Sequence, residues 1–451
     1  MFKKNSNIPF YIFLGLIACL CIFVYISPKF ERNPPNIEIP DMSYWNLKWN
    51  VPVRLLDFSG IKSYKVSFIQ NDEVTILIDE KNEENKQEIA FNLPIPKINI
   101  KDGDVLKYKI EAVDNSNYRF FLGNKIEKEF EIKIDLNPPE ARIIAMSNKI
   151  TYGGSAAVVF FARDENLANI SISNGYQSFV AFPFIKENYY VSIVPWSIHN
   201  PDFKGKIIVT DKARNTKNSN IGFSKYSKHY RISNLNLKNS FIDNKIASVI
   251  ESVSAIPLDS FSSRLEMFKY ANEYIRNNDE KIIYDKILNL DLPNAYPINA
   301  FRPIKDSVIV GIFGDHRKYT LDKELAGESY HLGTDLASIK NAQIFASNNG
   351  VVVLRENLGI YGNTIVLDHG LGIYSLYSHL SEFYVKENDE VKKGDIIGRS
   401  GDSGLAFGDH LHFGILIQGV FVLSTEFMDS RWLKANINDV LSEAIEIIEN
   451  K

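Results

Sequence analysis

Cysteine is almost absent from this chain of 451 residues: Cys19 and Cys21 are the only two, and both lie in an apolar run at residues 10–26. Any metal ligands further along the chain must therefore be His, Asp or Glu, and no disulfide is available there. An excess of either charge is also missing. The net charge of −4 arises from 51 basic and 55 acidic residues, which gives no basic footprint, so we expect no nucleic-acid partner.

The apolar run at residues 10–26 follows Lys3 and Lys4. Its 17 residues are near the lower limit for a membrane-spanning helix. The positive-inside rule then predicts a single-pass protein of the cell (inner) membrane, with residues 1–32 as cytoplasmic stub and anchor and the bulk of the chain outside, in the periplasm or its equivalent. A cleaved signal peptide and a lipoprotein signal, suggested by residues 16–19, are the alternatives. The anchor is favoured because no small-x-small site follows the run and apolar residues continue after Cys19.

Residues 33–236 read as short β-branched runs separated by Asn, Asp, Gly and Pro. An internal repeat organises them, with offsets of 104, 107 and 97 residues between its matched segments. The matched segments are Asn33-Pro34-Pro35 with Asn137-Pro138-Pro139, the segment that starts at Asp57 with the one that starts at Asp164, and the strand that ends at Asp114 with the one that ends at Asp211. A repeat of this size predicts two tandem β-sandwich (immunoglobulin-like) domains, residues 33–136 and 137–236, acting as spacers.

Helical periodicity begins after residue 240 and predicts a helical connector at residues 237–298, with helices at 242–253, 260–277 and 281–288. Strand patterns return in a C-terminal domain at residues 299–432. A C-terminal helix at residues 433–451 is predicted from the amphipathic stretch 437–448, whose apolar face indicates packing against the fold.

Six of the eight histidines fall between His316 and His412, which indicates a metal or catalytic site. A hydrolytic zinc ion needs three protein ligands, an open position for water and an unligated base. The candidates for these roles are His331, Asp335, His379, His410 and His412. The last two are separated by one residue, so a strand would project both rings from one face. The residues alone do not decide which of the two is the ligand.

The C-terminal domain resembles a known family in an ordered series of motifs: His331-Leu-Gly-Thr-Asp335, then residues 362–370, 376–380, 391–398 and 408–413. The series is similar to that of the lysostaphin and LytM-like zinc peptidases, peptidase family M23. The resemblance implies a mainly antiparallel β metallopeptidase domain with one Zn²⁺ per chain, bound by His331, Asp335 and His412. It also implies that His379 and His410 flank the reactive water as base and transition-state stabilisers. Gly414 departs from the pattern, because the family usually has Glu there.

The function implied by this resemblance is a zinc-dependent endopeptidase that hydrolyses the peptide cross-links of bacterial peptidoglycan during cell-wall remodelling. Its partners would be the peptide stems of peptidoglycan and the inner membrane; the sequence identifies no protein partner. The alternative is a catalytically weak domain that binds peptidoglycan or activates a partner hydrolase. Activity is favoured because all five polar positions are present. We also expect the connector to lie across the substrate groove, with Phe268 and Tyr270 as exposed aromatic positions.

Overall fold

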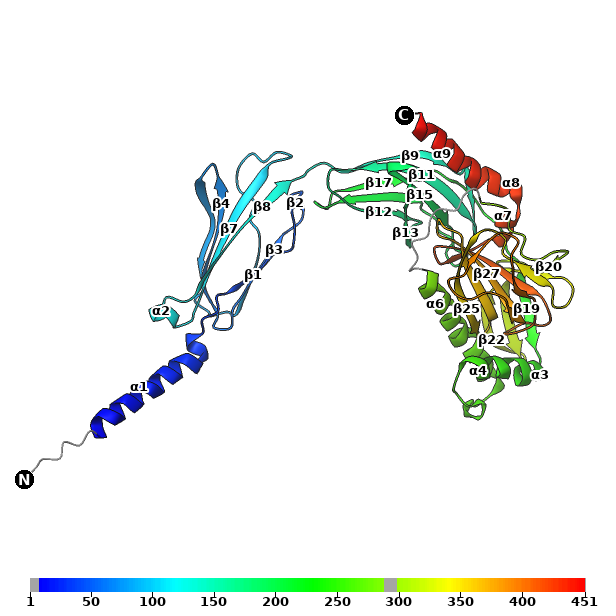
Figure 1. Cartoon of the computed structure of the whole chain (residues 1–451), viewed down its shortest axis with the longest axis horizontal. Coiled ribbons are helices and arrows are strands. Elements are labelled where there is room, and N and C mark those ends of the chain that lie inside the picture. Colours follow the sequence, from blue (N-terminus) through cyan, green and yellow to red (C-terminus); the bar gives the residue numbers. More distant parts are fainter. Residues whose placement is uncertain (1–7, 288–297, 451) are drawn as a thin grey trace, which may run out of the picture. The chain divides into compact units, whose positions relative to one another are not determined.

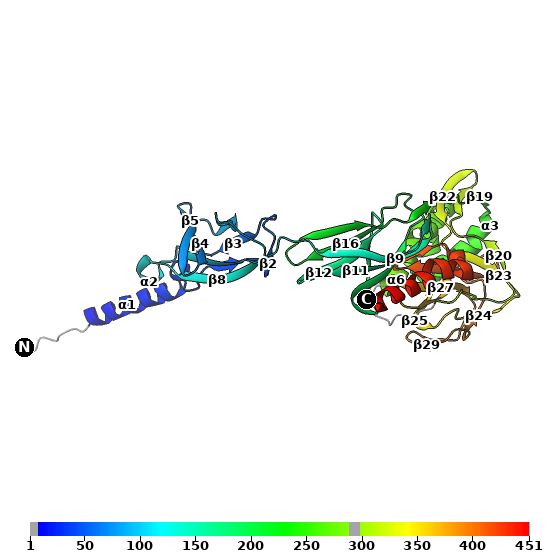
Figure 2. The ribbon, with the colours of Figure 1, turned by 90° about the horizontal axis from the view of Figure 1, so that it is seen from above.

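The computed structural model describes residues 8–287 and 298–450. The chain divides into two compact units. Unit 1 comprises Met1–Pro139, Asp164–Ala168 and Thr210–Thr216, and unit 2 comprises Glu140–Arg163, Asn169–Val209 and Lys217–Lys451. Unit 2 therefore continues across the boundary predicted at residues 236 and 237. Figures 1 and 2 show the elements of each unit from two directions.

Helix α1 (Ile8–Ile26) begins the described part of unit 1 (Figure 1). Residues 10–26 are thus helical, as their composition predicts. However, no helix within residues 8–287 and 298–450 is both long enough and apolar enough to cross a membrane. The prediction that residues 10–26 span a membrane is therefore not supported by this structure.

Two sheets enclose the core of unit 1. The smaller has the order β1-β3-β6 and the larger the order β2-β8-β7-β4-β5. Strand β7 alternates buried and partly exposed residues, which is the period of a strand with one face on a core. Trp45, Val66 and Tyr108 are among the core residues. The immunoglobulin-like assignment stays a prediction. The bounds are β1 (Asn36–Glu38), β2 (Tyr44–Trp45), β3 (Pro52–Leu56), β4 (Ile61–Gln70), β5 (Glu73–Lys81), β6 (Glu88–Asn92), β7 (Val105–Asp114) and β8 (Lys125–Ile134).

The second repeat forms two four-stranded sheets, β14-β15-β11-β9 and β13-β12-β16-β17. Strand β11, in the interior of the first sheet, is buried over most of its length, in keeping with its continuous apolar sequence. The bounds are β9 (Glu140–Met146), β11 (Ser155–Arg163), β12 (Leu167–Ser173), β13 (Ser178–Val180), β14 (Phe182–Phe184), β15 (Lys186–Pro195), β16 (Lys206–Asp211) and β17 (Thr216–Asn220). A short parallel pair joins β10 (Lys149–Thr151) to β18 (Ser224–Tyr226).

The C-terminal domain is built on an antiparallel sheet of order β20-β23-β31-β27-β26-β25-β29, with β32 beside β31. This confirms the prediction of a β-rich C-terminal domain. The bounds are β20 (Val308–Gly311), β23 (Thr334–Ala337), β25 (Gly350–Leu358), β26 (Gly362–Asp368), β27 (Ile373–Leu380), β29 (Glu390–Val391), β31 (Leu411–Ile417) and β32 (Val420–Val422). A three-stranded sheet has the order β24-β30-β28, with β24 (Gln343–Phe345), β28 (Glu382–Phe383) and β30 (Ile396–Arg399).

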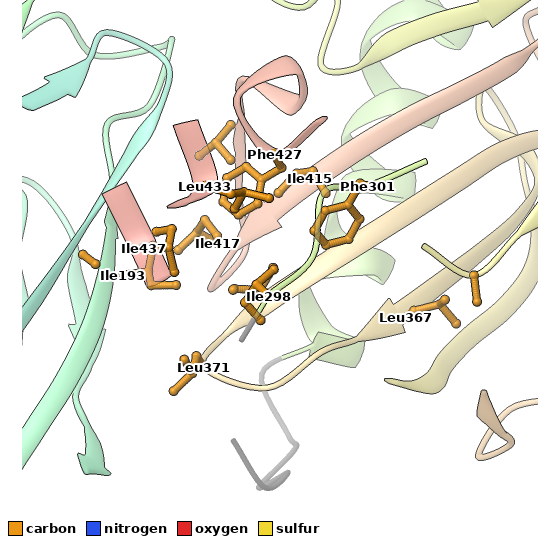
Figure 3. Close-up of a cluster of buried hydrophobic side chains, with 14 of the residues drawn as sticks. Ile193, Ile298, Phe301, Leu367, Leu371, Ile415, Ile417, Phe427, Leu433 and Ile437 are labelled. Atoms are coloured by element: carbon orange, nitrogen blue, oxygen red, sulfur yellow. The ribbon is translucent and has the colours of Figure 1, made fainter. Parts of the chain in front are cut away.

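One core of unit 2 joins the second repeat to the C-terminal domain. Ile193 of β15 belongs to the same buried cluster as Ile417 of β31 and Ile437 near the C-terminus. Figure 3 shows these side chains together with Phe427 and Leu433. Helix α9 (Asp439–Glu449) lies along β9 and β11 (Figure 1), and the short helices α7 (Ser424–Met428) and α8 (Ser430–Leu433) lead into it. The second repeat is therefore part of the body that holds the C-terminal domain.

The predicted connector is helical, and it packs against the C-terminal domain. It contains α3 (Asn239–Phe241), α4 (Ala247–Val253), α5 (Arg264–Lys269) and α6 (Arg276–Ile287), with π-helical segments at Ile242–Ile246 and Tyr270–Ile275. The predicted end at residue 288 lies outside the described residues. Phe268 is only 1% exposed, against Tyr319, so its assignment as an exposed aromatic is wrong. The helix contributes this side chain to a core that a local periodicity cannot reveal.

A small sheet brings the connector to the C-terminal domain. Strand β19 (Ile232–Leu237) pairs in parallel with β21 (His316–Leu321), which pairs with β22 (Glu324–Tyr330). Because β22 ends one residue before His331, this sheet fixes one side of the candidate site.

Candidate metal centre

Three neighbouring strands place most of the predicted site residues. Asp335 on β23 lies directly opposite His412 on β31, and His412 lies opposite Ser378 on β27. Residues that face each other across adjacent strands share a side of the sheet. His331 joins them from the loop between β22 and β23, where its N–H donates to the Asp315 carbonyl at 3.0 Å. The sheet thus gathers residues that are up to 81 positions apart in sequence.

The side chains of His331, Asp335 and His412 converge on one point. Nε2 of His331 lies 3.0 Å from Oδ1 of Asp335 and 3.0 Å from Nδ1 of His412. Nδ1 of His412 is 2.9 Å from the same carboxylate oxygen. Both imidazoles are buried, so bulk water does not weaken the electrostatic interactions among the three side chains. These three residues form a group that could hold a metal ion.

The hydrogen bonds around His331 suit a cation. Its Nδ1 lies 2.8 Å from the Ile312 carbonyl oxygen, which can only accept a hydrogen bond. This contact assigns the ring proton to Nδ1 and leaves a lone pair on Nε2, directed at Asp335 and His412. Two imidazoles and one carboxylate are a ligand set typical of zinc. Gly333 leaves room for the arrangement, since a Cβ there would stand 2.6 Å from Nε2 of His412.

His379 reaches the site through an unusual backbone conformation. In a regular strand the residue after Ser378 would face away from His412. His379 instead has φ of 62°, a left-handed value that costs a non-glycine residue about 1–3 kcal/mol. Its ring then lies 5.7 Å from that of His412. Its backbone N–H donates to the Tyr361 carbonyl at 2.9 Å, and Nδ1 lies 2.8 Å from the Ser403 carbonyl, which leaves Nε2 as the free acceptor.

His410 lies at the edge of the same site. Its Nε2 is 3.6 Å from Oδ1 of Asp335, compared with 2.9 Å for Nδ1 of His412. Its ring is 4.9 Å from that of His379. Nδ1 of His410 lies 2.7 Å from the Gly408 carbonyl, so this nitrogen carries a proton, as Nδ1 of His379 does. All five predicted residues are therefore gathered in one site, with His331, Asp335 and His412 as the tightest group.

Burial and the Asp335 carboxylate shift the pKa values of the site's histidines in different directions. Burial alone would raise the pKa of Asp335, but hydrogen bonds from His331, His410 and His412 lower it strongly. Burial lowers the pKa of His412 to about 4, and it lowers that of His379 well below its ordinary value. The Asp335 carboxylate outweighs burial at His410 and raises its pKa. His379 is thus held neutral, while His410 is the more easily protonated of the pair.

The site opens into a pocket of about 650 Å³ that the connector also lines. Phe241 and Arg276 come from the connector, and Arg317 comes from β21. Nη2 of Arg317 lies 3.7 Å from Oδ2 of Asp335, the oxygen that does not face the two imidazoles. The sequence did not single out Arg317, because nothing in its local pattern differs from an ordinary exposed strand position.

A second residue missed by sequence reasoning is Asp279 of α6, which is 1% exposed. Its carboxylate accepts from the N–H groups of Gly359 and Ile360, at 3.1 and 2.7 Å. The next residue in the chain is Tyr361, whose carbonyl holds His379. Asp279 therefore braces the turn that fixes the unusual conformation of His379. Its spacing of 100 residues from His379 gives no signal in the sequence.

The structure shows what surrounds Gly414, where the resemblance leads one to expect Glu. A Cβ at this position would meet Phe421 at 3.3 Å and Leu376 at 3.4 Å. Phe421 in turn stacks with Tyr361, with 6.3 Å between ring centroids. An apolar group thus occupies the space beside Gly414, and none of the five site residues relies on a carboxylate there for a hydrogen bond.

Comparison with known proteins agrees with this geometry. Residues 329–423 match the family model described as "Peptidase family M23", so the C-terminal part of the chain is an M23 domain. Peptidoglycan DD-endopeptidase ShyA of Vibrio cholerae is 36% identical over 124 residues, which is 28% of this chain and 27% of ShyA. Murein hydrolase activator NlpD of Salmonella dublin is 32% identical over 136 residues, 30% of this chain and 33% of NlpD. The chain thus spans about a third or less of each relative.

Among solved structures, the catalytic domain of the antimicrobial peptidase lysostaphin from Staphylococcus simulans is 27% identical. The match covers 27% of this chain and 92% of that domain, with a TM-score of 0.23.

Proposed function

We propose that this protein is a zinc-dependent endopeptidase that cleaves the peptide cross-links of bacterial peptidoglycan. The observation that carries the proposal is the convergence of His331 Nε2, Asp335 Oδ1 and His412 Nδ1 within 3.0 Å of one another, beside a pocket. The similarity of the M23 domain to ShyA, a peptidoglycan DD-endopeptidase, supports the substrate class. Because peptidoglycan lies outside the cytoplasm, we also place this domain on the outer side of the cell membrane.

In this proposal His331, Asp335 and His412 hold the zinc ion. A zinc ion bound there acidifies water and polarises a peptide carbonyl, which is the chemistry that amide hydrolysis at neutral pH needs. His379, kept neutral by burial, accepts a proton at Nε2. His410, whose pKa Asp335 raises, donates a proton or a hydrogen bond from Nε2 to the oxygen that gains negative charge.

The second candidate function is activation of a partner hydrolase, because the M23 domain is also similar to a murein hydrolase activator. The retention of all five polar residues in one site favours the enzyme. An activator binds its partner through the surface of the domain. It requires neither the convergence of the His331, Asp335 and His412 side chains nor the strained backbone at His379.

The decisive experiment digests purified cross-linked peptidoglycan with the full chain and identifies the released peptides by mass spectrometry. We expect cleavage within the cross-links and about one zinc per chain by elemental analysis. Replacing His331, Asp335 or His412 by Ala should remove both zinc and cleavage. The exposed His229 provides the control, and His229→Ala should keep both. A zinc-free wild-type protein that releases nothing, yet stimulates a partner hydrolase, would establish the activator instead.

A further inference from the structure

Two clusters of carboxylates lie in unit 1, far from the M23 domain in sequence. Each has three acidic residues, and one oxygen from each residue lies within 4.8 Å of the others. All six residues are assigned to unit 1. Cluster 1 consists of Glu31, Asp57 and Asp114, and cluster 2 consists of Asp135, Asp164 and Asp211.

The clusters are copies of each other in the internal repeat. Asp57 matches Asp164, and Asp114 matches Asp211, as the sequence offsets of 107 and 97 residues show. The first member of each cluster stands two residues before an Asn-Pro-Pro segment. The last member is buried in both copies, and the other two are partly exposed. The recurrence of three acidic residues at matched positions, with the same member buried, indicates a shared role.

The hydrogen bonds around the buried aspartates are also repeated. Asn124 donates its backbone N–H and its side-chain amide to the two oxygens of Asp114, both at 2.7 Å, and the amide also reaches the Glu31 carbonyl at 3.1 Å. Asn215 donates in the same way to Asp211, at 2.8 and 3.0 Å, and to the Asp135 carbonyl at 2.9 Å. These bonds fix the orientation of one carboxylate in each cluster.

In the described part of the chain, no basic side chain pairs with either cluster. Among residues 8–287 and 298–450, none of the six carboxylates forms an ion pair with Lys, Arg or His. Like charges at this spacing repel one another, and partial burial strengthens the repulsion. The clusters therefore differ from surface acidic residues such as Glu127, which bonds two lysines.

A buried oxygen without a partner lies beside cluster 2. Asn215 is only 5% exposed, and its buried Oδ1 has no hydrogen-bond partner among residues 8–287 and 298–450. The amide nitrogen of the same group is held by Asp135 and Asp211. Since a carboxamide is planar, its oxygen stands next to one of these two acceptors. A buried carbonyl oxygen without a donor is costly unless a cation or water satisfies it.

We propose that each cluster binds one Ca²⁺ ion. The available ligands are carboxylate, carboxamide and backbone carbonyl oxygens, with no imidazole or thiolate, which is the chemistry of calcium and differs from that of the His-Asp-His zinc centre. Calcium takes six to eight oxygens in irregular geometry, as loops of this kind provide, whereas Mg²⁺ demands a regular octahedron. This proposal does not depend on the peptidase activity.

Calcium binding to the full, zinc-loaded chain tests the proposal by equilibrium dialysis. We expect about two calcium ions per chain, with half-saturation at roughly 10⁻⁴–10⁻³ M or tighter, as in other extracellular modules. Asp57→Asn and Asp164→Asn should each reduce the stoichiometry by one, and the double variant should bind none. Asn keeps the oxygen that accepts from Ser59 in one cluster and from Asn166 in the other, so the turns remain intact.

The exposed Asp41 provides the matched control, since Asp41→Asn removes a charge of unit 1 outside both clusters. Calcium should raise the melting temperature of the wild type and of this control, but not that of the double variant. Absence of saturable calcium binding by the wild type would overturn the proposal. So would an unchanged stoichiometry in a double variant shown by circular dichroism to be folded, or equally tight competition by Mg²⁺.

Discussion

His379 and His410 have opposite electrostatic environments, although their rings are 4.9 Å apart. We predict that His379→Ala and His410→Ala each keep zinc and lose at least about 100-fold in kcat/KM, the usual size of a general acid or base contribution. Both side chains bond backbone carbonyls through Nδ1 and leave the ligand group intact. Elemental analysis and peptidoglycan digestion measure the two quantities. Zinc loss in His410→Ala with retention in His412→Ala would reverse the ligand assignment.

Glu426 gives a residue-scale prediction about pH. It is 8% exposed, its Oε2 has no hydrogen-bond partner among the residues that the structure describes, and burial raises its pKa from 4.5 to about 7. As pH rises, Glu426 ionises in the unfolded chain at a lower pH than in the folded protein. The folded state therefore loses stability between pH 4.5 and about 7. The shift corresponds to something on the order of 3 kcal/mol. Glu426→Gln should remove this loss, so its melting temperature should exceed that of wild type increasingly between those pH values. Parallel melting curves against pH would contradict the assignment.

The sequence was enough to name the five candidate residues, but not to derive the geometry that brings them together. Scarce histidines in an ordered series of motifs identified the five candidates. The left-handed backbone of His379 and the hydrogen bonds to Asp279 depend on contacts between residues about 20 and about 80 positions apart. Local sequence carries no information on such contacts. The same holds for Arg317, which contacts Asp335 only because β21 passes beside that residue.

At the scale of elements, the periodicity of the sequence predicted the strands and helices better than it predicted how they pack. The short β-branched runs of residues 33–236 agree with strands such as β7 and β11, and the amphipathic stretch 437–448 overlaps α9. The sequence pattern also predicted a helical connector with an exposed Phe268. The connector is helical and shares a core with β21 and β25 through side chains such as Ile283 and Leu354, and Phe268 belongs to that core. Removing residues before 299 would therefore expose a core, so truncation is a poor test of whether the connector restricts the groove.

A point substitution provides a better test of that role. Phe241 of α3 stacks on the exposed Phe407, with centroids 4.8 Å apart and planes at 12°, and it lines the pocket. It is only partly buried. We predict that Phe241→Ala opens the groove and raises kcat/KM on polymeric peptidoglycan several-fold, with unchanged zinc content and melting temperature. The exposed Tyr274 lies outside the pocket lining, so Tyr274→Ala is the control. An unchanged or lower rate in the first variant would make the stack a packing contact only.

At the scale of the whole molecule, the chain contains two units whose cores share no residues. Leu441 of α9 is 2% exposed and belongs to the core that joins the second repeat to the M23 domain. We expect calorimetry to show two unfolding transitions. Leu441→Ala should lower only one of them, by about 2–5 kcal/mol of unfolding free energy. Chelation of zinc should lower the same transition, since ligands stabilise the unit that binds them.

Val66→Ala in the core of unit 1 is the matched variant for the other transition. It should leave the zinc-sensitive transition unchanged, because distant substitutions without shared contacts act independently. The two variants together then assign each transition to a unit. If Leu441→Ala and Val66→Ala lowered both transitions equally, the two units would unfold as one cooperative body, and the second repeat would be coupled to the first as strongly as it is to the M23 domain.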